Sequence, residues 1–277
     1  MFCYYQDKFT PSQTLISSKD RSFLLGDGFF TTFKIEQGRV LFLEQHLTRL
    51  QQTAAILGMP WIWSFMDLIT ILSELYHLNH QQSDQLRVRV TVSRGEGQWG
   101  VLDSQTSHLF ISCSPWQVPL GPKSLMVSSQ RLDEQGILSC YKTTSRLNYV
   151  LAHQQAQQAH TDEALLLNLR GTVLCASSAN IWMVDDEKRL ITPKGGLQGV
   201  TKEYIKTCFS TQAFEEDIHI RQLETAKVLF LSSSMLGMHQ AYLNDRTFTE
   251  SALFASLQSD FNVYCQQHYN DLLNVYV

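Results

Sequence analysis

The sequence predicts an α+β protein of two domains, in which strands and helices do not form a repeating βαβ series. Short segments of alternating polarity indicate strands, amphipathic segments indicate helices, and a proline-rich break separates the two halves. The chain of 277 residues, 44% hydrophobic, is long enough to bury two modest cores. We expect an N-terminal α+β domain over residues 1–114, a linker over 115–123, and a C-terminal α+β domain over 124–277 that carries Lys142.

The first half is expected to contain a hairpin, two helices and two further strands. The helix that follows the hairpin is the clearest element, because Leu47, Leu50 and Leu57 share one face and Gly58 can end it. In chain order, the expected elements are strands 29–35 and 39–43, helices 43–58 and 64–78, and strands 86–93 and 108–112.

Periodicity is lost over 115–122, where Pro-Leu-Gly-Pro occurs, and we place the domain linker there. The second half is again rich in strands, with helices at its edges, which is typical of the α+β class. In chain order, its expected elements are strand 125–128, helix 147–159, strands 163–168, 172–176, 181–184 and 189–192, helix 201–209, strands 228–232 and 238–243, and helix 251–269.

The composition narrows the classes of function. A net charge of −4 and a pI near 6.1 give no basic excess, so nucleic acid is not an expected partner. No apolar run reaches the ~18–20 residues that a membrane helix needs, and the N-terminus lacks the layout of a secretory signal. The six cysteines form no Cys-x-x-Cys pair, which favours reduced thiols and disfavours a metal site. We therefore expect a cytoplasmic protein that binds a small molecule and no metal.

Lys142 is the central candidate for chemistry, although most lysines are solvated surface charges. A catalytic lysine can bond to an aldehyde through its amine and then move a proton at the substrate carbon. Such a lysine needs a lowered pKa, which burial and neighbouring cations provide. Arg146, one turn further along, could provide a neighbouring cation if it faces the same pocket.

Three further places could bind a phosphate. Val200 and Thr201 follow Gly199 at an expected helix start, where N–H groups and the helix dipole favour an anion, although an ordinary threonine cap is the alternative. Ser233 lies in a hydroxyl cluster at a strand end, which could bind phosphate or merely turn the chain. Arg49 could reach a phosphate with bidentate geometry, or it could lie on a solvated helix face.

Three arginines lie on the strand over 86–93 and its exit loop, at Arg87, Arg89 and Arg94. They could bind substrate carboxylates through their planar guanidinium groups. They could equally form structural salt bridges, and the sequence leaves both interpretations open.

Seven segments in chain order resemble motifs of the class IV aminotransferase-like family of pyridoxal 5'-phosphate (PLP) enzymes, known as fold type IV. Residues 26–32, Gly-Asp-Gly-Phe-Phe-Thr-Thr, resemble the family's Gly-Asp-Gly-x-Phe-Glu-Thr, and residues 199–202, Gly-Val-Thr-Lys, resemble its Gly-Ile-Thr-Arg. The other matching segments are 46–50, 90–95, Lys142 with 145–147, 162–167 and 177–181. The family includes branched-chain and D-amino acid aminotransferases and 4-amino-4-deoxychorismate lyase.

The resemblance implies a two-domain fold type IV enzyme in which Lys142 binds PLP covalently. The residues that it assigns to the cofactor phosphate are Arg49, Val200, Thr201 and Ser233, and those that it assigns to the substrate are Phe29, Arg94 and Arg146. Sites of this family lie between the two domains and borrow residues from a dimer mate. The resemblance therefore also implies a homodimer with a shared active site.

Within the family, the lyase branch fits best, because Leu147 stands five residues after the lysine, where branched-chain aminotransferases usually carry tyrosine. The resemblance then implies elimination of pyruvate from 4-amino-4-deoxychorismate to give 4-aminobenzoate, a folate precursor. Lys142 would take the α-proton, and either Lys142 or the Thr31 hydroxyl would return a proton as the ring product leaves.

Three positions depart from the family pattern. Cys175 replaces the glutamate that pairs with the pyridine nitrogen of PLP, and a largely neutral thiol would stabilise the carbanion less. We expect this to impair transamination more than β-elimination. Thr31 stands where glutamate is usual, and residues 98–100 lack the arginine of a Gly-Arg-Gly turn. The alternatives to the lyase are a D-amino acid or branched-chain aminotransferase and a degenerate PLP-binding homologue with little turnover.

Overall fold

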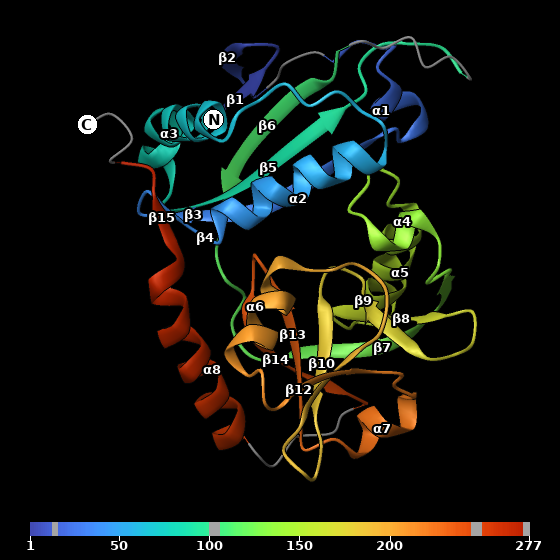
Figure 1. Ribbon diagram of the computed structural model, residues 1–277. Helices are drawn as coiled ribbons and strands as arrows, with labels where there is room; N and C mark the ends of the chain where they lie inside the picture. The colour runs from blue at the N-terminus through green and yellow to red at the C-terminus, as the bar shows by residue number, and fades with distance from the viewer. Residues whose placement is uncertain (13–15, 100–105, 245–250, 274–277) are drawn as a thin grey trace. The chain divides into compact units, whose positions relative to one another are not determined.

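The computed structural model describes residues 1–12, 16–99, 106–244 and 251–273, and the chain folds into two compact units (Figure 1). Unit 1 comprises Met1–Gln117, Lys142–Ser145 and His268–Val277, and unit 2 comprises Val118–Tyr141 and Arg146–Gln267. Each unit combines one sheet with several helices, and the sheets are not built as a regular βαβ series. The α+β class expected from the sequence is confirmed.

Unit 1 is built, within the described residues, on a seven-stranded antiparallel sheet. In sheet order its strands are β15 (Tyr269–Asp271), β4 (Arg39–Leu41), β3 (Gly28–Glu36), β5 (Gln85–Ser93), β6 (His108–Pro115), β1 (Phe2–Tyr5) and β2 (Lys8–Pro11). Its helices are α1 (Arg21–Leu25), α2 (Leu43–Ile56) and α3 (Phe65–Asn79), followed by a short 3-10 helix, η1 (His80–Gln82).

The hydrophobic core of unit 1 joins the sheet to α2 and α3. Every second residue of the paired strands β3 and β5 points into it, including Phe29, Phe33, Val88 and Val92, each at most 1% exposed. Figure 1 shows α2 running across this face of the sheet. The intervening residues of β3 and β5 therefore point to the opposite face.

The segment Lys142–Ser145 belongs to unit 1, although it lies within the residue range expected for the C-terminal domain, 124–277. The Phe30 N–H donates to the Lys142 carbonyl over 2.8 Å, and the Thr144 N–H donates to the Gly28 carbonyl over 2.8 Å. This pairing is possible because β4 covers only the far end of the outer edge of β3, at residues 35–36. Residues 142–144 thus complete the sheet edge beside the start of β3.

Unit 2 is built, within the described residues, on an eight-stranded mixed sheet whose β14–β7, β7–β8 and β11–β12 pairs are parallel. In sheet order its strands are β12 (Ala213–Glu216), β11 (Leu190–Pro193), β10 (Asn180–Val184), β13 (Val228–Ser233), β14 (Gly237–Leu243), β7 (Lys123–Leu132), β8 (Glu163–Asn168) and β9 (Val173–Ala176). Its helices are α4 (Ile137–Cys140), α5 (Leu147–Gln158), α6 (Val200–Cys208), α7 (Ile220–Thr225) and α8 (Ser251–Cys265), with a 3-10 helix, η2 (Gln266–His268).

The chain end after α8 also returns to unit 1. The helix expected over 251–269 stops at Cys265, and β15 then pairs antiparallel with β4, with Asn270 opposite Val40. Leu272, fully buried, anchors this segment in the core of unit 1. The helix expectation was wrong at its end because strand pairing with a distant segment overrides local helical preference.

The described part of the chain has no membrane-spanning helix, no metal-binding cluster and no disulfide. No helix there has the length and hydropathy required to cross a bilayer. No cluster of three His, Cys, Asp or Glu side chains there is placed to hold a metal ion. The six cysteines are all free thiols.

Candidate functional site

Lys142 lies at the sheet edge of unit 1, on the face opposite the core. Thr143 stands opposite Phe29 in an antiparallel bridge, and both side chains are buried on the core side, at 3% and 1% exposure. Because successive side chains alternate along an extended segment, Lys142 points to the same face as Phe30. The Lys142 Nζ lies 5.0 Å from the centroid of the Phe30 ring, and the lysine is half-buried.

A second cation contacts the same aromatic ring. The Arg89 guanidinium carbon lies 3.4 Å from the Phe30 ring centroid, and the Arg89 Nε donates to the Thr91 hydroxyl over 3.1 Å. Aromatic faces attract cations, so Phe30 can hold both side chains in place. An amine and a guanidinium on one ring make this face of the sheet attractive to a carboxylate or phosphate.

Three polar side chains meet on the core side of β3, where α2 crosses it. The Arg49 Nη2 donates to the Thr31 hydroxyl over 2.6 Å, and the same hydroxyl lies 2.7 Å from the Nδ1 of His46. Burial, reinforced by the charges of Arg49 and Lys142, holds the pKa of His46 well below its ordinary value. Burial lowers the pKa of Arg49 to about 10, so its guanidinium stays charged at neutral pH.

Unit 2 presents a helix start suited to an anion. Helix α6 begins after Gly199, a residue without a capping side chain, and the first N–H groups of a helix have no partner within the helix. Val200 and Thr201 are 6% and 3% exposed. A Cβ on Gly199 would lie 2.2 Å from the Asn180 Oδ1, so any larger residue here would force the Asn180 side chain or the helix start to shift. Backbone N–H groups at a helix start suit an anion, and the assignment of this one to a phosphate stays a prediction.

The hydroxyl cluster of β13 lies beside this helix start within unit 2. Asn180 on β10 pairs with Ser232, and Ser233 follows directly. The Ser232 hydroxyl accepts a hydrogen bond from the Trp182 indole N–H over 2.9 Å. The Ser233 hydroxyl accepts a hydrogen bond from the Leu236 N–H over 3.2 Å, so it stabilises the turn as well as being available to an anion.

Cys175 and Arg146 belong to a third group of residues, in unit 2. Cys175 on β9 is 5% exposed, lies opposite Leu166, and shares an apolar cluster with Tyr149. The Arg146 guanidinium carbon lies 3.2 Å from the Tyr149 ring centroid. Burial is the main cause that raises the pKa of Tyr149 to about 12. Arg146 therefore stacks on an aromatic ring at the start of α5.

The structure favours a structural role for two residues that the sequence assigned to the substrate. The Arg94 Nε lies 2.8 Å from an Asp27 carboxylate oxygen, and its other two nitrogens donate to the carbonyls of Gly58 and Leu57 over 3.1 and 2.8 Å. This is the salt-bridge alternative, in which Arg94 ties β5 to the end of α2. Phe29 is 1% exposed in the core and presents no surface to a substrate.

Sequence reasoning assigned no role to Phe30 and Asn180, and it did not single out Arg89 among the arginines. The signal for Arg89 was present, because strand alternation places it on the face of Phe30 and Lys142, away from the core. The sequence offers little indication of a role for Asn180, because its contact with Gly199 depends on the folding of two segments that lie apart in the sequence.

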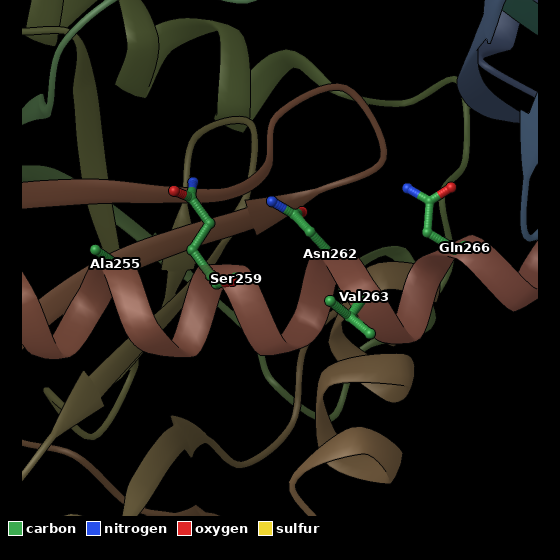
Figure 2. Close-up of a pocket in the computed structure, with 6 residues that line it drawn as sticks. Ala255, Ser259, Asn262, Val263 and Gln266 are labelled. Carbon is green, nitrogen blue, oxygen red and sulfur yellow. The ribbon is translucent and has the colours of Figure 1, made fainter.

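A separate pocket is formed by residues of α8 and its end. It measures about 310 Å³ and is lined by Ala255, Gln258, Ser259, Asn262, Val263 and Gln266. Figure 2 shows the labelled residues Ala255, Ser259, Asn262, Val263 and Gln266 along this helix. None of these carries a charge, and none is among the residues that the sequence predicted. It has no part in the candidate site.

The residues present fit PLP on two structural observations. Unit 1 holds the Lys142 amine and the Arg89 guanidinium against the Phe30 ring, and it holds the Arg49 guanidinium at Thr31 on the other face of β3. Unit 2 holds a helix start whose Gly199 position a side chain would fill. An amine suits the cofactor aldehyde, and backbone donors with an arginine suit its phosphate.

Comparisons with known proteins agree with this fit. A family model of amino-transferase class IV matches residues 28–241. The chain is 27% identical over 245 residues, 84% of each protein, to a protein of Methanocaldococcus jannaschii assigned as a branched-chain amino acid aminotransferase. It is 26% identical over 239 residues to the aminodeoxychorismate lyase of Vibrio harveyi, covering 82% of this chain and 86% of that one.

The fold is also that of a solved member of the family. The crystal structure of the branched-chain aminotransferase from Thermoproteus uzoniensis with norvaline superposes with a TM-score of 0.88 at 20% identity, over 98% of this chain and 99% of that one. The family depends on PLP, which confirms the expected cofactor. The chain therefore belongs to the class IV aminotransferase family of PLP-dependent enzymes, as its motifs predict.

Proposed function

We propose that this protein is a PLP-dependent lyase that eliminates pyruvate from 4-amino-4-deoxychorismate and forms 4-aminobenzoate. The observation that carries the proposal is Cys175, a buried thiol at the position of the family's pyridine-nitrogen glutamate. A thiol is a weak hydrogen-bond partner and is ordinarily neutral at pH 7, so it gives little help to a protonated ring. Elimination, in which the leaving group departs with the electron pair, tolerates this better than transamination.

Lys142 has the central role in this proposal. Its amine would bond to the cofactor, and it would then take the proton from the carbon that bears the substrate amine. PLP, when bound, supplies the electron sink for this step. The contact of Nζ with the Phe30 ring supports the assignment, because it limits the positions that the amine can occupy.

The elimination breaks one C–H bond and one C–O bond of the substrate. The proton leaves the carbon that bears the amine, the bond between the ring and the enolpyruvyl oxygen breaks, and the ring becomes aromatic. The departing group takes up one proton and is released as pyruvate. Lys142 is the better proton carrier for both transfers, since the Thr31 hydroxyl is fully buried and bonded to His46 and Arg49.

Phosphate binding is assigned to residues of both units. Arg49 would contribute a charged guanidinium, and the backbone of Val200 and Thr201 would contribute N–H donors at the start of α6. The Thr201 and Ser233 hydroxyls would complete the set. Support comes from Gly199, which adds no side chain of its own to the helix start and lies close to the Asn180 side chain.

The test supplies the PLP-loaded protein with 4-amino-4-deoxychorismate and measures pyruvate and 4-aminobenzoate. We expect equal amounts of both products, lost in Lys142→Ala and retained in Lys19→Ala, a matched change at an exposed lysine. A parallel assay measures amino transfer from D-alanine or L-leucine to 2-oxoglutarate. Amino transfer without release of pyruvate would contradict the lyase proposal.

Two alternatives have support of their own. An aminotransferase is favoured by the likeness to the Methanocaldococcus jannaschii protein, and the amino-transfer assay would reveal it. A homologue that binds PLP with little turnover is favoured by Cys175, and it would bind PLP and yield neither product.

We also propose that the enzyme is a homodimer. Apolar side chains on α4 and α5 are exposed, with Leu138 at 53%, Leu147 at 68% and Val150 at 58%. A second copy of the chain could cover such a surface. Light scattering after size-exclusion chromatography should give about twice the 31.7 kDa chain mass, and a Leu147→Asp variant should give the single chain mass.

A further inference from the structure

We propose that His46 is a positioning residue whose Nδ1 accepts the hydroxyl proton of Thr31, so that Thr31 holds the Arg49 guanidinium in the orientation that binds the cofactor phosphate. This inference rests on the proposed function, in which Arg49 contacts that phosphate. It assigns no proton transfer to Thr31 and gives a role to a buried histidine that the proposed reaction does not use.

The geometry that carries the proposal lies entirely in unit 1. His46 and Arg49 are three residues apart on α2 and therefore project from the same side of the helix. Both reach the Thr31 hydroxyl on β3, at 2.7 Å from Nδ1 and 2.6 Å from Nη2. Thr31 and His46 are both fully buried, so neither can exchange these contacts for water.

Counting protons selects one arrangement of this group. Arg49 can only donate, so the Thr31 oxygen accepts from it and has one proton left to give. If Thr31 donates to Nδ1, the His46 proton sits on Nε2, a buried atom with no hydrogen-bond partner among the described residues. If Nδ1 instead donated to Thr31, both the Thr31 proton and the Nε2 lone pair would lack partners. The first arrangement leaves fewer buried polar atoms unsatisfied.

The neutral state of His46 is part of this arrangement. A protonated imidazole would carry a proton on both nitrogens and could not accept from Thr31. Burial opposes protonation of His46, and so do the cations Arg49 and Lys142. Thr31 therefore keeps its acceptor, and its proton is directed at the imidazole rather than at a substrate.

The first test needs no variant. Nitrogen-15 NMR of the PLP-loaded protein, with the His46 signal assigned by its loss in His46→Asn, identifies which ring nitrogen carries the proton. We expect a single neutral tautomer protonated on Nε2. A proton on Nδ1, or on both nitrogens at neutral pH, would overturn the proposal whatever reaction the enzyme catalyses.

The second test measures the Kd for PLP of the cofactor-free protein. His46→Leu removes the acceptor, whereas His46→Asn keeps an acceptor oxygen near the Nδ1 position. Thr31→Val removes the hydroxyl, whereas Thr31→Ser keeps it. We expect binding about tenfold weaker in the Leu and Val variants, as for loss of a hydrogen bond to a charged group, and near-normal binding in the Asn and Ser variants. His77→Gln, at an exposed histidine, is the control.

Arg49→Met separates this inference from the proposed function. If Arg49→Met leaves the Kd for PLP unchanged, the assignment of Arg49 to the phosphate is wrong. If Arg49→Met weakens binding but Thr31→Val does not, the phosphate assignment stands and the role of His46 and Thr31 is refuted. Thermal unfolding of each variant establishes that it is folded, and equal losses in the Leu and Asn variants would count against the proposal.

Discussion

Gly199→Ala probes the phosphate cradle with a single methyl group. The added Cβ would lie 2.2 Å from the Asn180 Oδ1, well inside van der Waals contact. The backbone of Gly199 has φ of −73° and ψ of 135°, which alanine adopts readily, so backbone strain is not the source of any effect. The Asn180 side chain cannot simply swing away, because its Nδ2 donates to the Leu197 carbonyl over 3.1 Å and the residue is 9% exposed.

The magnitude follows from the cost of overpacking. An extra methyl group in a well-packed site typically costs about 1–3 kcal/mol. If about 2 kcal/mol of this is spent by displacing the start of α6, the Kd for PLP rises about thirtyfold. The free energy of unfolding of the cofactor-free protein should fall by a similar or smaller amount.

The assay titrates the cofactor-free variant with PLP and follows its absorbance, with thermal unfolding as the check on folding. Adding Asn180→Ala to Gly199→Ala removes the clashing oxygen. The Kd for PLP of this double variant is compared with that of Asn180→Ala alone, and the difference should be much smaller than that between Gly199→Ala and the wild type. A folded Gly199→Ala protein that binds PLP as tightly as the wild type would refute the assignment of this helix start to the phosphate.

Three further predictions concern the reaction preference set by Cys175, the pH dependence of stability set by His46, and the stabilising role of Arg94. Cys175→Glu should raise amino transfer relative to pyruvate release, measured with both assays; no gain in amino transfer would remove the electronic argument. The pKa of His46 in the folded protein lies well below its unfolded value near 6.5, so at low pH the unfolded chain binds one more proton than the folded protein. The free energy of unfolding should therefore fall as pH drops below about 6.5, by up to about 1.4 kcal/mol per pH unit. Chemical denaturation between pH 7 and 5 measures this slope, and His46→Asn should make it shallower. Arg94→Met should lower the free energy of unfolding by about 2 kcal/mol, because it removes a charge-assisted contact to the Asp27 carboxylate, which keeps its ion pair with Arg21. Unchanged stability, together with loss of substrate affinity, would restore the substrate-binding interpretation of Arg94.

The longer elements could be predicted from the sequence because each has its own periodicity. Helix α2 begins at the predicted residue, and β8 has the predicted bounds, Glu163–Asn168. The elements β1, α4 and β12, of four residues each, are too short for a period to show, and they were not predicted. The place of Lys142 in unit 1 could not be predicted, because it depends on strand pairing with a segment more than a hundred residues away.

The candidate site was predictable in its residue types but not in the direction of its side chains. Motif resemblance selected Phe29, whereas strand alternation puts Phe29 in the core and Phe30 beside Lys142. The three-residue spacing of His46 and Arg49 was visible in the sequence. Their shared partner Thr31 was not, because it comes from a different element.

The central claim is that Lys142 carries PLP. Borohydride reduction of the loaded protein makes the bond between a lysine amine and the cofactor permanent, and mass spectrometry of the digested protein then locates it. We expect the added mass on the peptide that contains Lys142, and no added mass in Lys142→Arg. Added mass on another lysine, such as the deeply buried Lys202, or none on any lysine, would contradict it.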